Sequence, residues 1–556
     1  MRENPEGWSV AESAEITNHR DNGSWTALSP SSLPSGRKLV KLVWVYKVKR
    51  SGKLKARLCV QGCSQVPGID YDQTWCGTMR APTLRLLSAL SARHGLIARR
   101  WDFVAAYLQG ELEEDEVVYC HAPPGYEQDA NGKPYICRVE KPVYGMAQAG
   151  RRWQRTIFPW FTDPEQGFTQ STSDPCVFFK QQTVQTPNGP RDEKLILGCY
   201  VDDLYTLASH DDEHSLYASF VRNLQARWEV EDEGEIADLL NVEISREGKQ
   251  VVLRQRGYID RMCDLHLPDE TAADWKRVKT PCTDALPRAV SDAQSSATEP
   301  RDPALVKRYQ SLVGALNYCA TNTRPDIAFS VGYLSRALSC PTEELESSAL
   351  RVLRYLGAHR DLGLFYDHCD DSLVGRSDSD WAVKHSTTGF VFTFCRAAIS
   401  WGSKRQKSIA LSSCEAEIVA ASEAAKEATY FGRFLEELGD GSGSPVELGV
   451  DNQAARDLAY NPEHHERTKH IDRRHFFVRE KVEEGVITVP YVNTDDNIAD
   501  FFTKPLDVKK FRAFRDRIMN TPPHTGSSMY SDGGVSHGGP CDMDAEAPAG
   551  CHWVSD

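Results

Sequence analysis

The sequence predicts a multidomain α+β protein. Its 556 residues, 40% of them apolar and 26% charged, are enough for roughly three or four globular domains. In two separate regions, short apolar runs typical of strands end at carboxylates. Between these regions, residues 304–320 and 326–357 carry Leu, Val and Ala at helical spacing. We therefore expect a mixed α+β region, then helices, then a second α/β region.

Shifts in composition indicate where these parts begin and end. The predicted order is a polar, loosely ordered lead-in (1–36), a first folded region (37–282), a linker and helical connection (283–370), a second α/β region (371–519) and a disordered tail (520–556). Ser, Ala, Asp and Pro are frequent over 283–303, the best linker candidate, and Gly, Ser, Pro and His are frequent in the tail.

Composition also excludes several classes of protein. No apolar run approaches the ~20 residues of a membrane span, and the first residues lack the apolar core of a secretory signal. The 16 cysteines contain no Cys-x-x-Cys pair, which argues against a zinc ribbon and fits a reduced, intracellular protein. A net charge of −14 argues by itself against a nucleic-acid-binding protein.

The distribution of charge indicates otherwise. Between Asn22 and Ile69 there is no acidic residue, and a local basic block of this kind is what phosphate binding requires. The basic residues are Arg37, Lys38, Lys41, Lys47, Lys49, Arg50, Lys53, Lys55 and Arg57. Residues 39–60 partly alternate apolar with basic around a Ser51-Gly52 turn, so they predict a basic β-hairpin. The alternative is a solvated basic strand pair.

Three carboxylates mark the first region. Asp202 and Asp203 interrupt the apolar run 195–207, which we interpret as a hairpin. Two adjacent carboxylates beside a core repel each other and lose solvation, and a divalent cation removes both penalties. Asp102 lies within a second apolar run, 99–108, and is the candidate third ligand. The alternatives are solvated aspartates at a hairpin tip and, for Asp102, a buried aspartate hydrogen-bonded to backbone.

Other segments of this region have simpler patterns. Residues 82–95 predict a helix with Pro near its start and Gly at its end. Residues 141–155 combine a Gly turn, three arginines and Gln148, which we expect to be exposed. Residues 181–193 predict a polar loop, and residues 211–247 are mixed and acidic.

A second set of carboxylates occurs in the C-terminal region. Its elements follow the order strand, strand, helix, strand, helix, which can bring four carboxylates together on two metal ions. The four are Asp378, Glu417, Asp451 and Asp500, with Asp380 as a nearby alternative to Asp378. Glu415 has a structural explanation, because Ser412 and Glu415 have the spacing of a helix capping box. The alternative for each residue is an ordinary surface acid.

His464, His465 and His470 fall in a strongly basic segment. A zinc site is one interpretation. A nucleic-acid contact surface fits the basic charge better.

The motifs taken together resemble a known family. Tyr200-Val201-Asp202-Asp203 is similar to the active-site box of reverse transcriptases, and residues 24–515 resemble the C-terminal part of copia-type LTR-retrotransposon Pol polyproteins. The similarity is carried by residues 43–49, 55–58, 68–74, the box around Asp102, 143–149, the Asp202-Asp203 box, 377–381, 399–401, 411–413, 415–417, 451–452, 466–472, 499–500 and 503–504.

The resemblance implies a fold and roles for individual residues. It implies a right-hand polymerase with fingers, palm and thumb, followed by a helical connection and an RNase H-like domain. Asp102, Asp202 and Asp203 match the polymerase carboxylates, and the four C-terminal carboxylates match the RNase H quartet. The resemblance places Lys55 and Arg57 at the incoming triphosphate, Tyr107 against the ribose 2′ position, and Gln148 near nucleotide and template.

The resemblance also implies cofactors and partners. It implies two Mg²⁺ ions in each active site, with Mn²⁺ as an alternative, and the two-metal chemistry of in-line displacement. The implied partners are an RNA template, a DNA or tRNA primer, dNTPs and an RNA–DNA hybrid, with no membrane and the oligomeric state left open. The implied location is intracellular, in cytoplasmic virus-like particles and in the nucleus.

Some residues depart from the family pattern. The hairpin is shorter than usual between Arg50 and Lys55, Val104-Ala105 stands where Lys-Thr is common, and Asn241 replaces a usual glycine. No upstream Pol enzymes precede residue 24, so we expect a fragment, a processed product or a decayed copy. The main hypothesis is an RNA-directed DNA polymerase with RNase H activity. The alternatives are a non-catalytic nucleic-acid-binding remnant and a remnant that keeps only the nuclease.

Overall fold

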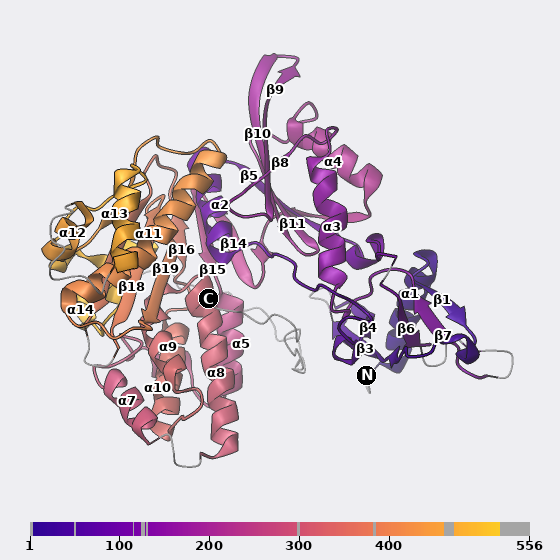
Figure 1. Ribbon diagram of the computed structural model, residues 1–556, viewed down its shortest axis with the longest axis horizontal. Coiled ribbons are helices and arrows are strands. Elements are labelled where there is room, and N and C mark those ends of the chain that lie inside the picture. The colour runs from indigo at the N-terminus through magenta and orange to yellow at the C-terminus, as the bar shows by residue number, and fades with distance from the viewer. Residues whose placement is uncertain are drawn as a thin grey trace. The chain divides into compact units, whose positions relative to one another are not determined.

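The computed structural model describes residues 4–48, 52–114, 116–123, 128, 132–296, 301–381, 385–460 and 472–522 (Figure 1). The chain divides into two compact units. The N-unit contains the described residues of 1–78 and 103–167, and the C-unit contains those of 79–102 and 168–522. Both units combine helices with sheets, so the predicted α+β class is confirmed. None of the helices described here is long and apolar enough to cross a membrane.

The N-unit contains two sheets. One has four strands in the order β1-β7-β6-β2, and the other is the β3-β4 hairpin. The elements are α1 (Pro5–Asp21), β1 (Trp25–Leu28), η1 (Pro30–Ser32), β2 (Leu39–Val40), β3 (Leu42–Val48), β4 (Leu54–Val60), η2 (Gly62–Ser64), η3 (Ala106–Gln109), β6 (Val118–His121), β7 (Ile136–Val139) and α3 (Ala149–Thr162). The predicted basic hairpin is therefore confirmed, with Lys47 opposite Lys55.

The prediction of a loosely ordered lead-in is wrong, because residues 5–21 form helix α1. Asn4 caps its start by accepting a hydrogen bond from the Gly7 amide at 2.9 Å, and Pro5 stands at the first turn. The helix packs on the basic hairpin through Trp8, whose ring lies 5.1 Å from that of Tyr46. Its apolar residues are too few to give a clear helical pattern in the sequence. Packing on the hairpin stabilises the helix instead.

A six-stranded antiparallel sheet opens the C-unit, in the order β12-β5-β11-β10-β9-β8. Its elements are α2 (Ala81–His94), β5 (Ile97–Phe103), β8 (Thr169–Gln170), β9 (Val177–Thr186), β10 (Gly189–Tyr200), β11 (Asp203–Ala208), α4 (Leu216–Arg227) and β12 (Val230–Glu235). The predicted helix at 82–95 and the hairpin at 195–207 are confirmed.

The prediction of a polar loop over 181–193 is wrong. These residues form the outer half of the long β9–β10 hairpin (Figure 1). Cross-strand pairs maintain the hairpin beyond the core, and the Thr183 hydroxyl donates to Asp192 at 2.6 Å. Polar residues with branched β-carbons suit an exposed two-stranded ribbon, so polarity alone was a misleading sign of a loop.

A second sheet and a group of helices follow. The sheet has the order β13-β14-β15-β16. The elements are β13 (Asp238–Leu239), β14 (Val242–Glu247), β15 (Gln250–Arg254), α5 (Arg256–His266), α6 (Ala272–Trp275), α7 (Leu286–Ser295), α8 (Pro303–Asn322), η4 (Pro325–Ile327), α9 (Ala328–Leu334), η5 (Ser335–Ala337), α10 (Glu343–Ala358) and β16 (Leu364–Tyr366). The predicted helix at 304–320 is confirmed as α8, and the predicted helix at 326–357 is divided into η4, α9, η5 and α10.

The first part of the predicted linker, 283–303, is not a linker. It forms α7, and Leu286, Ala289, Val290 and Ala293 are buried there. Their spacing of three, four and seven residues is that of one helix face. The small size of the alanines concealed this face behind a Ser- and Pro-rich composition.

The last sheet has five strands in the order β19-β18-β17-β20-β21. Strands β17, β18 and β19 are antiparallel neighbours, whereas β20 runs parallel to both β17 and β21. The elements are β17 (Val374–Asp380), β18 (Thr387–Phe394), β19 (Ala397–Arg405), α11 (Ser413–Glu437), β20 (Val446–Gly449), α12 (Gln453–Tyr460), α13 (Asp472–Glu483), β21 (Ile487–Thr488), η7 (Thr494–Asp496), η8 (Ile498–Phe502) and α14 (Val508–Met519).

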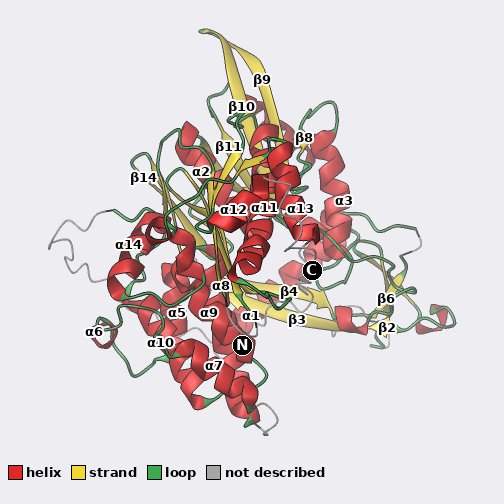
Figure 2. Cartoon of the chain, turned by 60° about the vertical axis from the view of Figure 1, so that its left-hand side comes forward, coloured by secondary structure: helices red, strands yellow, loops and turns green. Residues whose placement is uncertain are grey.

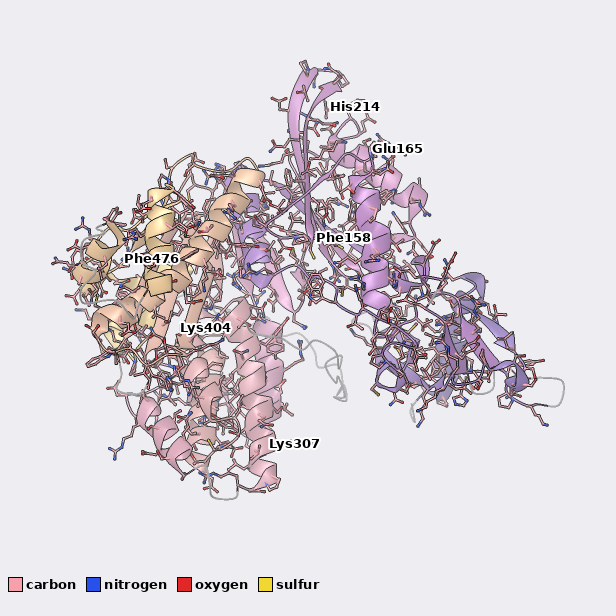
Figure 3. All side chains as sticks on the ribbon, viewed as in Figure 1. Phe158, Glu165, His214, Lys307, Lys404 and Phe476 are labelled. Carbon is pink, nitrogen blue, oxygen red and sulfur yellow. The ribbon has the colours of Figure 1, made fainter. Side chains whose placement is uncertain are left out.

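Helices cover this sheet. Helix α11 packs along β17 and β18, and α12 and α13 pack against it (Figure 2). The side chain of Lys404, near the end of β19, is exposed, and so is that of Phe476 on α13 (Figure 3). The predicted hairpin at 388–401 and the long helix ending near Gly439 are confirmed. The predicted tail lies outside the described residues from position 523 onward.

Arg85 links helix α2 to two other elements of the C-unit, strand β19 and the end of α8. This buried side chain on α2 donates to the carbonyl of Ile399 on β19 at 2.7 Å, and to those of Thr321 and Asn322 at 2.7 and 2.9 Å. Its guanidinium also lies 4.0 Å from the ring centre of Trp401. Burial lowers the pKa of Arg85 to about 10, so the side chain stays charged at neutral pH. One buried side chain thus bonds to three carbonyls on two neighbouring elements of the C-unit.

Candidate active sites

The first carboxylate site contains Asp102, Asp202 and Asp203, and the register of two strands builds it. Asp203 at the start of β11 lies opposite Asp102 on β5. Directly opposed residues of antiparallel strands carry their side chains on one face with Cβ atoms about 5 Å apart. Asp202 lies in the two-residue turn between Tyr200 and Asp203. The hairpin and its pairing with β5 therefore bring all three aspartates to the same end of the sheet.

Backbone strain fixes the turn. Val201 has a φ of 58°, a left-handed conformation that is rarely adopted by branched side chains and costs about 1–3 kcal/mol. Neighbouring strand pairs on both sides hold the residue in place. Asp202 directly follows this strained residue in the turn.

Arg100 neutralises part of this site. It donates to Asp203 from two nitrogens, at 2.9 and 2.7 Å, and lies 3.1 Å from Glu233 and 3.3 Å from Asp238. Burial nevertheless raises the pKa of the Asp203 carboxyl, and the guanidinium opposes that rise. Arg100 therefore supplies the positive charge for Asp203 in the absence of a bound cation.

Two further carboxylates lie beside Asp102, and our reading of the sequence missed them. Oxygens of Asp102, Glu231 and Glu233 lie within 4.8 Å of one another. The three predicted aspartates do not form such a group among the described residues, because the Asp203 carboxylate is turned toward Arg100. The sequence did contain a sign of these carboxylates, since glutamates occur at positions 229, 231, 233 and 235, just before and along β12. A period of two places them on one face of a strand.

The residues predicted to bind substrate lie in the N-unit. The guanidinium of Arg57 lies 4.5 Å from the ring centre of Tyr144, and the rings of Tyr107 and Tyr144 are 4.6 Å apart. Gly145 makes this stack possible, because a Cβ at that position would lie 2.1 Å from the Val60 carbonyl oxygen. Arg57 and Tyr107 thus belong to one cation–aromatic stack, and Lys55 lies two residues away on β4.

Gln148 has a different environment from the one expected. The side chain is fully buried, not exposed. Its carbonyl accepts from Gln65 at 3.1 Å, and its amide donates to the Asp70 carbonyl at 3.2 Å. These bonds connect the start of α3 to the loop after β4. In the structure Gln148 therefore supports its neighbours, and a role in contacting nucleotide stays a prediction.

The second carboxylate site contains Asp378, Glu417, Asp451 and Asp500. Oxygens of three of them, Asp378, Asp451 and Asp500, lie within 4.8 Å of one another. Glu417, one turn into α11, accepts from the Ser379 amide at 3.2 Å and is buried beside the group. Asp380 is not part of this group. Strand β17, the loop after β20, α11 and η8 thus contribute one carboxylate each.

Two features of the sequence let η8 approach the sheet. Gly389 on β18 lies opposite Asp378, and a Cβ there would lie 2.6 Å from Thr503 and 2.9 Å from the Ala499 carbonyl oxygen. Asn497 caps η8 and donates to the Ser377 carbonyl at 3.0 Å. The missing side chain of Gly389 and the amide of Asn497 together bring Asp500 beside Asp378.

Burial and mutual repulsion alter the titration of this site. The pKa of Asp378 is raised to about 7, mainly by burial; the charges of Asp500 and Asp451 contribute to the rise, while the Thr503 hydroxyl bonds the carboxyl and opposes it. Burial also raises the pKa of Glu417 well above its ordinary value. The protein therefore pays desolvation and repulsion to hold these carboxylates together.

Two lysines offset this cost at Asp500. Lys504 lies 2.6 Å from one of its oxygens, and Lys510 on α14 donates to the other at 2.9 Å. Asp380, in contrast, is half-buried, and its pKa is raised by burial. The segment with His464, His465 and His470 lies outside the described residues.

Comparison with known proteins identifies the family. Residues 24–278 match the family model described as reverse transcriptase (RNA-dependent DNA polymerase). That segment of the chain is similar to the reverse transcriptase family. The chain is 33% identical over 515 residues to the Retrovirus-related Pol polyprotein from transposon TNT 1-94 of Nicotiana tabacum, covering 91% of this chain and 37% of that protein.

Other relatives extend the similarity beyond the reverse transcriptase segment. The Pol polyprotein from transposon RE1 of Arabidopsis thaliana is 32% identical over 531 residues, 93% of this chain and 34% of that protein. The copia-type Pol resemblance is therefore confirmed, and the chain spans about a third of the length of these relatives. A solved foamy viral protease-reverse transcriptase in complex with RNA/DNA hybrid is also similar, with TM-score 0.49 and 12% identity, over 94% of this chain and 56% of that one.

Two of the departures of this chain from the family pattern have structural explanations. Asn241, at the position of a usual glycine, has a φ of 55°, and Asn adopts this left-handed conformation more readily than most residues. Ala105, in the box after Asp102, has a φ of 49°, and its small side chain lessens the steric conflict there. Both substitutions therefore preserve a backbone that turns sharply.

The donor sets of the two carboxylate sites fit hard divalent cations. Both sites offer only carboxylate oxygens, the ligands that Mg²⁺ prefers. One oxygen of Glu417 is buried without a hydrogen-bond partner among the described residues, although buried acceptors are ordinarily paired. A cation beside Asp378 and Glu417 would satisfy that oxygen and remove the repulsion between the carboxylates.

Proposed function

We propose that this chain is an RNA-directed DNA polymerase that also cleaves the RNA strand of RNA–DNA hybrids. The first carboxylate site transfers nucleotides, and the second hydrolyses RNA. The observation that carries the proposal is the pairing of Asp203 with Asp102 beside the strained turn of Asp202, within a segment of the reverse transcriptase family. The expected metal is Mg²⁺, two ions in each site.

The protein's own residues would perform distinct tasks at the first site. Asp102, Asp202 and Asp203 would hold the cations, which when bound supply the positive charge that stabilises an in-line phosphoryl displacement. The strained Val201 directly precedes Asp202 in the turn. Arg100 orients Asp203. In the N-unit, Lys55 and Arg57 offer positive charge for a triphosphate, and the ring of Tyr107 offers a face for the sugar.

At the second site the four carboxylates would be the ligands. Glu417 and Asp378 are held in place by the Ser379 amide and the Thr503 hydroxyl. Lys504 and Lys510 fix both oxygens of Asp500. The proposed partners are an RNA template, a DNA or tRNA primer, dNTPs and a hybrid. The proposed location is the cytoplasmic virus-like particle and the nucleus.

The test is Mg²⁺-dependent extension of a DNA primer on an RNA template. We expect Asp202→Asn to abolish extension, a loss on the order of 10³-fold or more because a metal ligand is removed, and to leave cleavage of a labelled RNA–DNA hybrid unchanged. Asp211→Asn, an exposed aspartate beyond β11, is the matched control and should retain both activities. Equal loss of both activities in Asp202→Asn would contradict the two-site proposal.

One observation favours the alternative of a nuclease-only or non-catalytic remnant. Asp203 is already neutralised by Arg100, and the three aspartates of the first site do not form a compact oxygen group in the described residues. Hybrid cleavage without primer extension, in folded protein that binds the duplex, would support the nuclease-only reading. Binding without either activity would support the remnant.

A further inference from the structure

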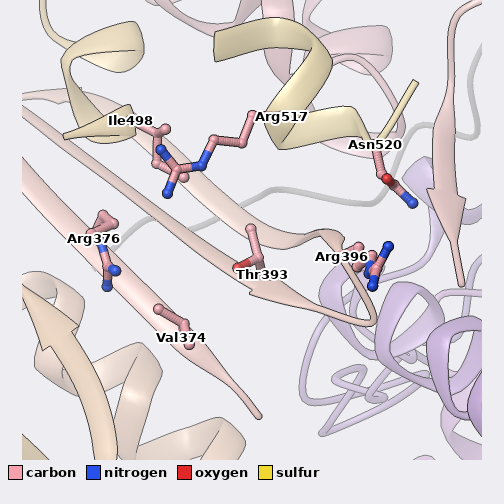
Figure 4. A pocket seen from close by; sticks show the side chains of 7 residues that line it. All are labelled: Val374, Arg376, Thr393, Arg396, Ile498, Arg517 and Asn520. Carbon is pink, nitrogen blue, oxygen red and sulfur yellow. The ribbon is translucent and has the colours of Figure 1, made fainter. Parts of the chain in front are cut away.

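A cavity in the last sheet of the C-unit is lined by arginines and is separate from both carboxylate sites. Its volume is about 290 Å³. Val374 and Ile498 contribute apolar walls, and Arg376, Arg396 and Arg517 surround the opening (Figure 4). None of these residues takes part in the chemistry proposed above, so the cavity requires its own explanation.

The three arginines come from three different elements. Arg376 lies on β17, Arg396 in the turn between β18 and β19, and Arg517 on α14 (Figure 4). Arg396 has a φ of 70°, so a left-handed turn presents its side chain. Folding therefore gathers three positive charges around one cavity, in a chain whose net charge is −14.

Nearby carboxylates compensate these charges incompletely. Arg376 lies 2.9 Å from the half-exposed Glu447. Arg396 lies 3.6 Å from Asp367 and 3.7 Å from Asp371, distances too long for good hydrogen bonds. Exposed pairs of this kind are weak and are readily exchanged for another anion.

Arg517 is the least compensated of the three. It pairs with no carboxylate among the described residues, and its one hydrogen bond is a long one, 3.4 Å, to the Asp496 carbonyl. A guanidinium has five N–H donors in a fork that matches phosphate oxygens. Most donors of Arg517 are therefore available to a ligand.

We infer that this cavity binds a phosphate group. Three guanidiniums lining one cavity suit a compact, multiply charged oxyanion, and the apolar side chains of the lining suit its attached organic part. Two sources share this chemistry: a backbone phosphate of a nucleic acid and a free phosphate such as a nucleotide. Arg376 precedes Asp378 by two residues on the same strand, roughly 7 Å along it. A backbone phosphate in the cavity would therefore belong to a strand passing the second carboxylate site.

The first arm of the test uses inorganic pyrophosphate and isothermal titration calorimetry, with EDTA present so that no metal bridges the probe to the carboxylates. We expect Arg517→Gln to weaken binding about tenfold, because a charge-assisted bond is lost, and Arg396→Gln/Arg517→Gln to weaken it further. Arg512→Gln is the matched control, since this arginine is exposed on the same helix and outside the cavity. It should bind as the wild type does.

The second arm measures binding of a fluorescent RNA–DNA hybrid by anisotropy in the same EDTA buffer. A double variant that loses affinity for both pyrophosphate and hybrid supports a nucleic-acid backbone as the source. Loss for pyrophosphate alone supports a free phosphate ligand. Wild-type protein that does not bind millimolar pyrophosphate, or four proteins that bind it equally, would overturn the inference. A failure of primer extension would leave the pyrophosphate arm intact, so the two proposals fail separately.

Discussion

The two carboxylate sites of the C-unit hold acidic groups together in different ways. Asp202 and Asp203 are partly exposed at a hairpin turn, and an arginine neutralises one of them. Asp378 and Asp500 are 4% and 0% exposed, inside a sheet and a short helix. The exposed site is held by backbone strain and an ion pair. The buried site is held by close packing, at the expense of raised carboxyl pKa values.

This difference indicates how far the protein's own basic side chains balance the carboxylate charge at each site. Charge at the first site is already balanced by Arg100, so a cation must compete with a guanidinium for Asp203. At the second site only Asp500 is balanced, by two lysines, and the remaining carboxylates repel one another. We therefore expect the second site to gain more stability from a cation than the first.

The largest expected effect is a loss of stability of the C-unit, which contains both carboxylate sites. Arg85→Met leaves three carbonyl acceptors of the C-unit without their donor. We expect the free energy of unfolding to fall by about 3 kcal/mol and both activities to fall together on warming. Chemical denaturation and both activity assays at increasing temperature would measure this.

Arg93→Met on the same helix is the control for Arg85→Met. Its partner, Asp370, is 93% exposed and 3.5 Å away, so the loss should stay below about 1 kcal/mol. Loss of one activity alone in Arg85→Met would show that the two carboxylate sites are energetically independent.

The next prediction separates the sites by the size of a stability change. In EDTA at pH 8, Asp378→Asn should stabilise the protein by about 1–2 kcal/mol, because it removes a buried charge that other carboxylates repel. Asp203→Asn should change the free energy of unfolding by less than about 1 kcal/mol, because relief of the burial that raises the pKa of Asp203 is offset by loss of its pair with Arg100. Denaturant titration of both variants measures the two changes. Equal stabilisation by both variants would mean that Arg100 does not offset the charge of Asp203.

Much of the fold followed from pattern, and the failures had a common cause. Carboxylates embedded in or beside apolar runs pointed to Asp102 and Asp203, because burial of the run predicts a strand. Segments read from composition were wrong, since α1, α7 and the β9–β10 hairpin are stabilised by packing and cross-strand pairing that composition does not encode. Polarity was mistaken for disorder in each case.

The basic side chains that balance the carboxylates could not be predicted from the sequence either. Arg100 lies two residues before Asp102 on the same strand face, but its partner Asp203 is about a hundred positions away in sequence. Lys510 meets Asp500 only because Gly389 lets η8 approach the sheet. The alternating glutamates of β12 were visible in the sequence, and only the position of that strand beside β5 gives them meaning.

A third prediction uses pH. The pKa of Asp378 in the folded protein, about 7, lies above the ordinary value of ~3.9, so the folded state binds this proton more tightly. The resulting stabilisation is complete below about pH 4 and is lost as pH rises through 7. Mg²⁺ should therefore raise the melting temperature more at pH 8 than at pH 6, by about 2 °C. The difference should vanish in Asp378→Asn. A pH-independent gain in that variant and in the wild type would contradict this assignment.

The smallest expected effect tests the competition at the first site. Arg100→Gln keeps a neutral donor near Asp203 and removes the positive charge, so a cation should bind more easily. The Mg²⁺ concentration for half-maximal primer extension should fall about threefold, corresponding to ~0.7 kcal/mol of lost competition. Arg99→Gln is the control, because that neighbour pairs with Asp232 at 2.7 Å and does not contact Asp203. A rise in the Mg²⁺ requirement of Arg100→Gln would instead show that the guanidinium holds Asp203 in its ligand position. The two sites would then be alike: in each, a basic side chain of the protein would orient a carboxylate without competing with the metal ion for it.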